Sequence, residues 1–429
     1  MTIAPVVSVA PTADELAELD RRHLFHPWTP FGVSDQLVIV EGHGCEVTDS
    51  YGRTYLDGRS GQFNAALGYG HPRVLAALLE QARKLMTYAL LGASNKPAVL
   101  LAARLATLLG QPLARTFFAN SGSEATEAAV RMARMFHALR GQPDRTMVIS
   151  LADGYHGTTI ATAAMSASPI AWAGCGPLPG GFTSIPTPRE AADAEALSEA
   201  IIAHGPGRVA AFVVEPVLGV GGIYPLPDGY LRAVRDVCDR NGVLLVVDEV
   251  TTGFGRTGVW FAYQREGIRP DVVTTGKGLT AGYAPLAAVT TTDTIADAFA
   301  GDPMLGGLRH GHTTTGHALA AAIALAVLQT IEDDGLIEHA ATAGDRLRAG
   351  LTDTLTGMPG VRDIRGVGLL VGIELDSFER AAGIVMGCRR EGVIIRNEGP
   401  VISVAPPLIV STDQVDRIVD TVAAAAAGG

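Results

Sequence analysis

The sequence has few cysteines, and their spacing suggests neither a disulfide framework nor a metal site. Four occur in 429 residues, Cys45, Cys175, Cys238 and Cys388, and no two form a CxxC pair. We therefore expect reduced thiols and a cytoplasmic location, with no metal. Apolar runs fall short of the roughly 20 residues that cross a bilayer, and the first 20 residues lack the basic start of a secretory signal. No membrane partner is expected.

The sequence also has fewer basic than acidic residues. The chain has 33 Lys plus Arg against 44 Asp plus Glu, a net charge of −11, which would repel a phosphate backbone, so nucleic acid is not an expected partner. Hydrophobic residues make up 47% and charged residues 18%, proportions typical of a compact globular protein. At roughly 100 to 200 residues per domain, the length predicts two or three structural units.

The middle of the chain reads as an α/β domain. Short apolar runs alternate there with helical patterns, and strands that are apolar on both faces and separated by helices predict a parallel sheet covered on each side. Between about residues 101 and 290 the runs are Thr116 to Ala119, Met147 to Ser150, Val209 to Val214, Leu244 to Val247, Val272 to Thr275 and Leu286 to Thr290. The spacing also predicts a helix over 124–139 that starts just after Ser121-Gly122-Ser123.

The two chain ends read as one smaller α+β unit. Residues up to about Asp57 show the short alternating runs of an antiparallel meander. Beyond about Ala320 a long Ala-rich helix precedes the strand-like pieces LLVGIEL and GVIIR and a final helix from Thr412. We therefore expect residues 1–60 and 319–429 to build the small domain around a large domain of residues 61–318.

Three strand ends of the large domain carry polar residues suited to chemistry. Asp248 follows the strand Leu244 to Val247, at the edge where open parallel sheets bind ligands, although a lone acid there can simply cap a turn. Lys277 follows the strand DVVTTG between two glycines, where a solvated loop lysine is the alternative.

The third strand end meets a helix start. There Ser121-Gly122-Ser123 follows Phe117-Phe118-Ala119, and free N–H groups favour an anion, although Ser121 and Glu124 also fit an ordinary capping box. We therefore expect a phosphate site, an amine and a carboxylate on adjacent strand ends of one sheet. Pyridoxal phosphate (PLP) requires these three groups for its phosphate, its aldehyde and its ring nitrogen.

Long motifs in a fixed order then carry a family resemblance. The chain resembles class III (ω-type, subgroup II) PLP-dependent aminotransferases of fold type I, almost from end to end. The motifs are HLFHPWTP, YGRTYLDGRSGQFNAALGYGHP, NSGSEATEAAVRMAR, DGYHGTT, VVEPV, VDEVTTGFGRTG, TTGKGL, HGHTTTGHA and VAPPLIV. The resemblance implies a large domain with a mostly parallel seven-stranded sheet and a small α+β domain from both chain ends.

The resemblance assigns roles around the cofactor. Lys277 matches the Schiff-base lysine, and Asp248 matches the acid that keeps the pyridine nitrogen protonated. Val250 matches the side chain on one ring face, and Tyr155, with His156 beside it, matches the aromatic residue on the other. Further matches are Ser121, Gly122 and Ser123 in the phosphate loop, Thr313, which reaches the phosphate of the neighbouring subunit, and Glu215, near the cofactor's hydroxyl side. Because each active site would be shared, the family implies a homodimer or a dimer of dimers. Glu215 could equally pair with Arg256.

Two matches concern the substrate. Arg396 lines up with an arginine that binds the carboxylate of a keto acid or amino acid, for which a planar guanidinium is suited, although it could be a surface arginine. Phe63 stands where relatives often carry a bulky Trp or Tyr. Thr314 replaces an aromatic residue of the common H-T-Y-S-G-H-P pattern, and Gln62 and Asn64 make the Phe63 segment unusually polar. These differences leave the substrate's identity open.

The resulting prediction is an aminotransferase with a ping-pong cycle. An amine or amino acid would donate its amino group, and a keto acid, aldehyde or ketone would accept it. Other reactions run on the same scaffold, so an aminomutase of the glutamate-semialdehyde type, a decarboxylase or a racemase is the alternative. A cofactor-sensing regulator would need a DNA-binding module, for which the acidic N-terminal segment is too short. A non-catalytic relative is disfavoured because Lys277 and Asp248 are both present.

Overall fold

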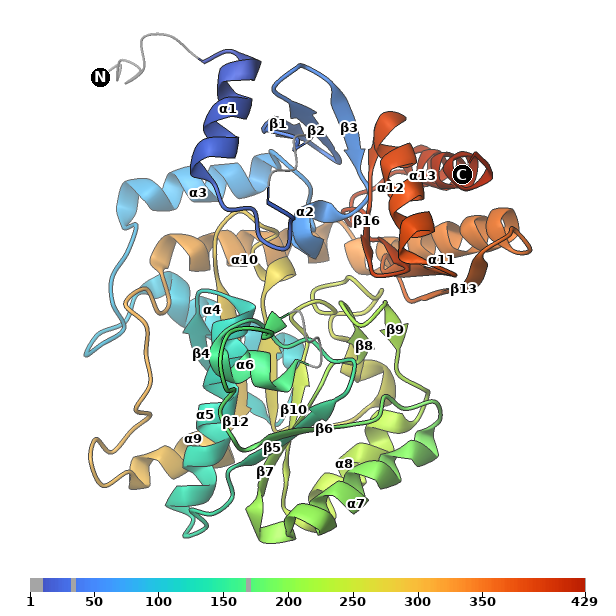
Figure 1. The fold of residues 1–429 in the computed structure, drawn as a ribbon. Helices are drawn as coiled ribbons and strands as arrows, with labels where there is room; N and C mark the ends of the chain where they lie inside the picture. The colour runs from blue at the N-terminus through green and yellow to red at the C-terminus, as the bar shows by residue number, and fades with distance from the viewer. Residues whose placement is uncertain (1–10, 32–35, 167–170, 429) are drawn as a thin grey trace.

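The computed structural model describes residues 11–31, 36–166 and 171–428. A seven-stranded sheet forms the large domain, with strand order β4-β12-β11-β10-β7-β5-β6 (Figure 1). These strands are β4 (Leu113–Ala119), β5 (Met147–Leu151), β6 (Phe182–Ile185), β7 (Val209–Val214), β10 (Leu244–Asp248), β11 (Val272–Thr275) and β12 (Ala287–Thr292). All but β12 run in the same direction, which confirms the predicted mostly parallel sheet.

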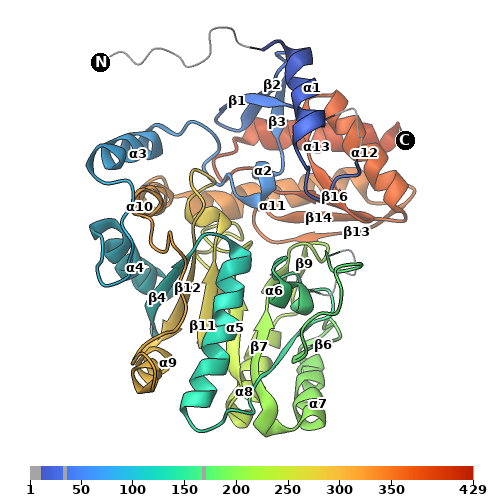
Figure 2. The same cartoon turned by 60° about the vertical axis from the view of Figure 1, so that its left-hand side comes forward.

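Helices cover both faces of this sheet because its strands are apolar on both sides. On β10, Leu244 and Val246 join the cluster beneath α5 (Gly122–Leu139), whereas Leu245 and Val247 join the larger cluster on the opposite face. Figure 2 shows α5 lying across the sheet. The other helices are α1 (Ala13–His23), α2 (Ser60–Phe63), α3 (Pro72–Lys84), α4 (Lys96–Leu109), α6 (Ile160–Met165), α7 (Glu195–His204), α8 (Tyr230–Asn241), α9 (Asp293–Ala298), α10 (Ala318–Asp333), α11 (Leu336–Leu355), α12 (Phe378–Arg390) and α13 (Thr412–Ala427), with 3-10 turns η2 (Ala191–Ala194), η3 (Pro206–Arg208), η4 (Ala262–Glu266), η5 (Lys277–Leu279) and η6 (Phe299–Gly301).

The two chain ends meet in the upper part of the molecule (Figure 2). The N-terminal meander of β1 (Ile39–His43), β2 (Glu46–Asp49) and β3 (Thr54–Asp57) is completed by β15 (Val393–Ile394), which pairs in parallel with β3. A second sheet has the order β13-β14-β17-β16, and α11, α12 and α13 pack beside it. Its strands are β13 (Val361–Gly366), β14 (Val371–Leu375), β16 (Arg396–Glu398) and β17 (Val401–Val404), and a small hairpin joins β8 (Val217–Leu218) to β9 (Tyr224–Pro225). The boundaries at 60/61 and 318/319 stay a prediction.

Three details differ from the sequence reading. Strand β12 is antiparallel to both neighbours and separates β4 from β11, so the three strand ends share one edge of the sheet but do not all lie on adjacent strands. Strand β6 is an additional edge strand, and α5 begins at Gly122, inside the predicted loop, because Ser121 caps it.

In the described part of the chain no helix is long and apolar enough to span a membrane, and no group of three or more metal-ligating side chains occurs. Residues 1–10, part of the segment read as lacking a secretory signal, lie outside the described residues.

Candidate active site

The carboxyl ends of β4, β10 and β11 bring the three predicted groups to one edge of the large sheet. Asp248 is the last residue of β10, and Lys277 follows β11 after a single glycine. The N-terminus of α5 follows β4 after Asn120 and Ser121. This arrangement confirms the predicted elements and their order along the chain.

Asp248 is buried among hydrogen-bond donors. Its Oδ2 atom lies 2.8 Å from Nδ1 of His156 and 3.5 Å from Oγ1 of Thr126, and its Oδ1 accepts the Val250 N–H at 3.1 Å. Burial alone would lower the pKa of His156, but the hydrogen bond and charge of Asp248 outweigh it and raise that pKa. These contacts hold the Asp248 side chain in one orientation.

Lys277 presents a buried amine next to this carboxylate. Its backbone has φ +36°, in the left-handed region that only a few non-glycine residues adopt. Its Nζ atom donates to Oγ1 of Thr251 at 2.6 Å. Burial lowers the pKa of Lys277 from 10.5 to about 8, although the charges of Glu215 and Asp248 act in the opposite direction. This amine therefore loses its proton at a lower pH than an ordinary lysine does.

The N-terminus of α5 lies close against Val250. Oγ of Ser121 accepts the Glu124 N–H at 3.2 Å, but the Glu124 carboxylate accepts from Asn120, so only half of the predicted capping box forms. A Cβ added to Gly122 would lie 2.8 Å from Val250 Cγ1. The first N–H groups of an α-helix have no intrahelical partner, and they favour an anion.

A second glycine keeps a neighbouring loop close to this helix end. Gly157 has φ +126°, and a Cβ there would lie 2.4 Å from Oγ of Ser123. The same Oγ accepts the Thr158 N–H at 3.2 Å. The loop after β5 is therefore pressed against the phosphate-loop residues at a position that only glycine can occupy without strain.

These residues match the three polar groups of PLP. The helix end supplies N–H donors for a phosphate, Lys277 a buried amine for the aldehyde, and Asp248 a buried carboxylate for a ring nitrogen. Val250 lies between the carboxylate and the helix end, because its own N–H bonds Asp248 and its methyl group faces Gly122. The set therefore has the donors, the amine and the acid that this cofactor needs.

Glu215 joins the Tyr155 loop to the turn after β7. Its Oε2 accepts the Tyr155 N–H at 2.9 Å, and its Oε1 accepts the Gly219 N–H at 3.0 Å. Burial raises the pKa of Glu215 to about 7. The alternative pairing with Arg256 does not occur: among the described residues, Arg256 donates to the carbonyl oxygens of Leu369 and Pro406 and to Oγ of Ser60.

Phe63 and Arg396 converge on Lys277 from the small-domain side. The Phe63 ring centroid lies 5.7 Å from Lys277 Nζ and 5.2 Å from Arg396 Cζ. Arg396 also forms an ion pair with Glu398. Burial lowers the pKa of Arg396 to about 10, and the charge of Arg59 adds to this effect. Arg396 is therefore a partly exposed residue of β16 that lies over the Phe63 ring.

The loop that carries Thr313 lies beside the phosphate loop of its own chain. Oγ1 of Thr314 donates to Oδ1 of Asn120 at 2.5 Å, whereas the Thr313 side chain is exposed. The segment around residues 86–95 packs on this loop, because the Asn95 side chain donates to the Gly316 carbonyl oxygen at 2.8 Å. Figure 1 shows both segments at the same side of the large domain.

Sequence reasoning missed several contacts of this site. Thr251 and Glu398 stand inside the motifs VDEVTTGFGRTG and GVIIRNEG, so their positions were visible but their partners were not. Thr126 lies one turn into α5 and reaches Asp248 across the sheet edge. The contacts of Thr251 and Thr126 join segments far apart in the chain, so only the packing of those segments reveals them.

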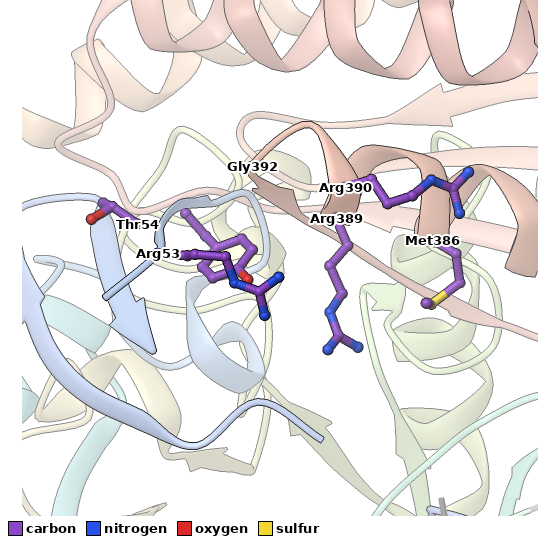
Figure 3. A pocket seen from close by; sticks show the side chains of 7 residues that line it. Arg53, Thr54, Met386, Arg389, Arg390 and Gly392 are labelled. Carbon is purple, nitrogen blue, oxygen red and sulfur yellow. The ribbon is translucent and has the colours of Figure 1, made fainter. Parts of the chain in front are cut away.

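A pocket elsewhere on the molecule is remote from this chemistry. It has a cavity volume of about 250 Å³ and lies between β3 and α12, where Arg53, Arg389 and Arg390 line it (Figure 3). Neither Lys277 nor Asp248 lines it. The chemistry therefore belongs to the sheet edge and not to this pocket.

Comparisons with known proteins agree with the geometry. The family "Aminotransferase class-III" matches residues 32–426. An adenosylmethionine-8-amino-7-oxononanoate aminotransferase of Geobacter sulfurreducens is 36% identical over 94% of this chain and 96% of its own length. An acetylornithine aminotransferase of Methanothermobacter thermautotrophicus is 36% identical, over 95% and 97%.

A solved structure of an amine transaminase from an uncultivated Pseudomonas species, in its PLP-bound form, is similar over 95% of this chain and 98% of that one, with 33% identity and a TM-score of 0.92. Family, relatives and structure agree on the cofactor and on the reaction type. The chain belongs to the class III aminotransferases, PLP-dependent enzymes that transfer an amino group from a donor to a keto acid.

Proposed function

We propose that Lys277 is the residue that binds PLP covalently and moves the proton in each half-reaction. The observation that carries this proposal is the buried amine of Lys277 beside the Asp248 carboxylate and the start of α5. PLP, when bound, supplies an electron sink and carries the amino group between donor and acceptor. Nζ of Lys277, once freed by the donor, takes the proton from the substrate carbon as a general base.

Asp248 pairs with the ring nitrogen and keeps it protonated. His156 is a positioning residue, because its Nδ1 holds Oδ2 of Asp248 at 2.8 Å while Thr126 approaches the same oxygen. Val250 and Tyr155 would hold the two faces of the ring, and Glu215 positions Tyr155 through its backbone N–H. These groups orient the ring in a site that excludes water, where electrostatic stabilisation is strongest.

Ser121, Gly122 and Ser123 bind the phosphate through the N–H groups at the start of α5, and Thr313 of the partner subunit completes this site in a homodimer or a dimer of dimers. Support comes from exposed apolar side chains near the Thr313 loop: Leu91 is 95% exposed, Met304 77% and Leu305 67%. Exposed apolar area of this kind marks protein interfaces. Leu91→Glu should therefore yield monomers in light scattering and lower the PLP affinity, whereas Thr313→Ala should lower the PLP affinity and leave the dimer intact.

Arg396 binds the carboxylate of the keto acid or amino acid, and Phe63 forms a wall of the amine pocket. The Arg396 guanidinium and the Lys277 amine both lie over the Phe63 ring, 5.2 Å and 5.7 Å from its centroid. An arginine fork matches a carboxylate in two parallel hydrogen bonds. A cytoplasmic location stays a prediction. The four free cysteines agree with it, because thiols remain reduced in the cytosol.

Two half-reactions test the function and separate it from the alternatives. Holoenzyme mixed with a panel of amines and amino acids, without any keto acid, should convert one equivalent of cofactor to its amine form, followed by absorbance, and then stop. A keto acid added later should restore the first spectrum. An aminomutase or a decarboxylase would instead turn over repeatedly without the acceptor, and that result would overturn the proposal.

A further inference from the structure

A buried carboxylate holds the turn that presents Phe63. Asp57 ends β3 and is buried. Its Oδ2 accepts the Gly61 N–H at 2.6 Å and the Tyr69 hydroxyl at 2.6 Å, and its Oδ1 accepts the Arg59 N–H at 3.0 Å. Hydrogen bonds to an ionised acceptor are among the strongest in proteins, and two of these donors belong to the backbone. The carboxylate therefore fixes the start of the turn.

The backbone of this turn needs such support. Ser60 has φ +50° and Phe63 has φ +62°, both in the left-handed region that non-glycine residues rarely adopt. Each such residue costs free energy and persists only where the surrounding contacts fix the backbone. The Ser60 hydroxyl anchors the middle of the turn, because it donates to the Ala405 carbonyl oxygen at 2.6 Å. Without the Asp57 hydrogen bonds the rest of the turn can relax, and the Phe63 ring then moves.

Tyr69 ties this carboxylate to the N-terminal meander. Its backbone exchanges two hydrogen bonds with Gly44, of 2.9 Å and 2.8 Å. Its ring packs on Gly42 of β1, where an added Cβ would lie 2.7 Å from the Tyr69 Cγ atom. The hydroxyl of this fixed tyrosine therefore holds the Asp57 carboxylate in one orientation.

The ring that the turn presents lies beside the amine proposed to react. The Phe63 ring is buried, and its centroid lies 5.7 Å from Nζ of Lys277. A side chain at this distance limits the size of a substituent that can lie next to the amine. One methylene group more or less in a hydrophobic pocket changes discrimination between substrates about tenfold or more. A small movement of the ring should therefore change which amines fit.

We infer that Asp57, held by Tyr69, is a positioning residue that sets the size of the amine pocket through the backbone of Phe63. This inference rests on the proposed role of Phe63 as a wall of that pocket. Loss of the Asp57 hydrogen bonds lets the ring move away from Lys277, so that bulkier substituents enter.

The same meander contains a matched carboxylate that serves as a control. Asp49 ends β2 and is buried. It accepts the Tyr51 N–H at 2.9 Å, the Arg53 N–H at 3.0 Å and the Tyr55 hydroxyl at 2.9 Å. Its turn carries none of the residues proposed to bind cofactor or substrate. Substitutions at this carboxylate should therefore cost stability and leave the pocket unchanged.

Two aminooxy probes measure the pocket in the holoenzyme. O-methylhydroxylamine and O-benzylhydroxylamine both react with the aldehyde carbon of bound PLP and need no proton transfer at a substrate carbon, so their rates report access to the site. Phe63→Ala should raise the ratio of the benzyl rate to the methyl rate about tenfold or more. Asp57→Asn should raise this ratio about threefold or more, the size of a typical coupling between neighbouring residues.

Three further variants separate positioning from a general loss of stability. Tyr69→Phe should raise the ratio in the same direction as Asp57→Asn with a smaller effect, and it serves as the test if Asp57→Asn does not fold. Asp49→Asn and Tyr55→Phe should lower the unfolding temperature and leave the ratio at its wild-type value.

A double variant shows whether the carboxylate acts through the ring. In a Phe63→Ala background, Asp57→Asn or Tyr69→Phe should leave the ratio where Phe63→Ala alone puts it. A further rise there overturns the inference. So does a ratio in Asp57→Asn and Tyr69→Phe no higher than in the two control variants, and in both cases the role of Phe63 as a wall stands. An unchanged ratio in Phe63→Ala overturns the inference and that role together.

Discussion

Nδ1 of His156 lies 2.8 Å from Oδ2 of Asp248, and both side chains are almost completely buried. Each residue arrives from a different strand end, His156 from the loop after β5 and Asp248 from β10. The His156 N–H to Ser166 bond of 3.0 Å fixes the loop that carries the ring. The pair therefore sets the orientation of the carboxylate before any cofactor binds.

Loss of the His156 donor should lower both stability and turnover. His156→Ala leaves the buried Asp248 carboxylate without its closest partner, a change that costs about 3 to 5 kcal/mol when a buried ion pair is broken. His156→Asn keeps a donor near the same place and should recover part of the loss. Thermal unfolding and single-turnover rates at saturating PLP would measure this. Equal rates for Ala and Asn would contradict the positioning role.

Lys277→Ala should bind PLP without a covalent bond and lose about 10² to 10⁴-fold in half-reaction rate, the usual contribution of a general base. Borohydride treatment of wild-type holoenzyme should leave a pyridoxyl adduct on the peptide that contains Lys277, visible by mass spectrometry. Lys84→Ala is a matched control, because Lys84 is an exposed partner of Glu80 on α3. An adduct on another lysine would disprove the assignment.

The pKa of Lys277, lowered by burial to about 8, predicts how cofactor loading depends on pH. Only the neutral amine attacks an aldehyde, so the rate at which apoenzyme takes up PLP should rise with pH and level off above about 8. Glu215→Gln removes a carboxylate that favours the charged amine, so the inflection should move to lower pH. A rate that still climbs beyond the ordinary lysine value would contradict the burial of this amine.

Gly157→Ala should weaken PLP binding, because the new Cβ collides with Ser123 at a backbone conformation unsuited to alanine. Such strain costs about 1 to 3 kcal/mol, and each 1.4 kcal/mol that reaches the binding site raises the Kd about tenfold. Gly141→Ala offers the comparison: it also has positive φ, +77°, but lies after α5 with open space around it. Equilibrium dialysis should show weaker PLP binding only for position 157.

Much of the large domain was predictable from the sequence, because its strands and helices depend on patterns within a few residues. Apolar runs located the strands β4, β5, β7, β10, β11 and β12, and the residue after each run showed which polar groups the sheet edge receives. The existence of α5 was also predictable from its apolar spacing, although the helix begins two residues earlier than predicted because Ser121 caps it through the Glu124 N–H. The family motifs then assigned roles to residues whose type alone decided nothing, such as Tyr155 and Val250.

The direction of each strand and the hydrogen-bond partners of charged side chains were harder to predict from the sequence. The sequence between β11 and β12 does not predict that β12 is antiparallel to its neighbours. The direction of a strand depends on which edges of the sheet are unpaired when the strand joins it. Similarly, the charges of Glu215 and Arg256 would allow them to pair. In the folded chain, however, Arg256 donates hydrogen bonds to the carbonyl oxygens of Leu369 and Pro406.

By itself the sequence determined which residues stand at strand ends and at a helix start, since periodicity and capping act over a few residues. Only the tertiary structure decided how those groups affect one another: that burial lowers the pKa of Lys277 to about 8, and that His156 holds Asp248. Burial and charge interactions depend on distance in space, and that distance is set by segments far apart in the chain.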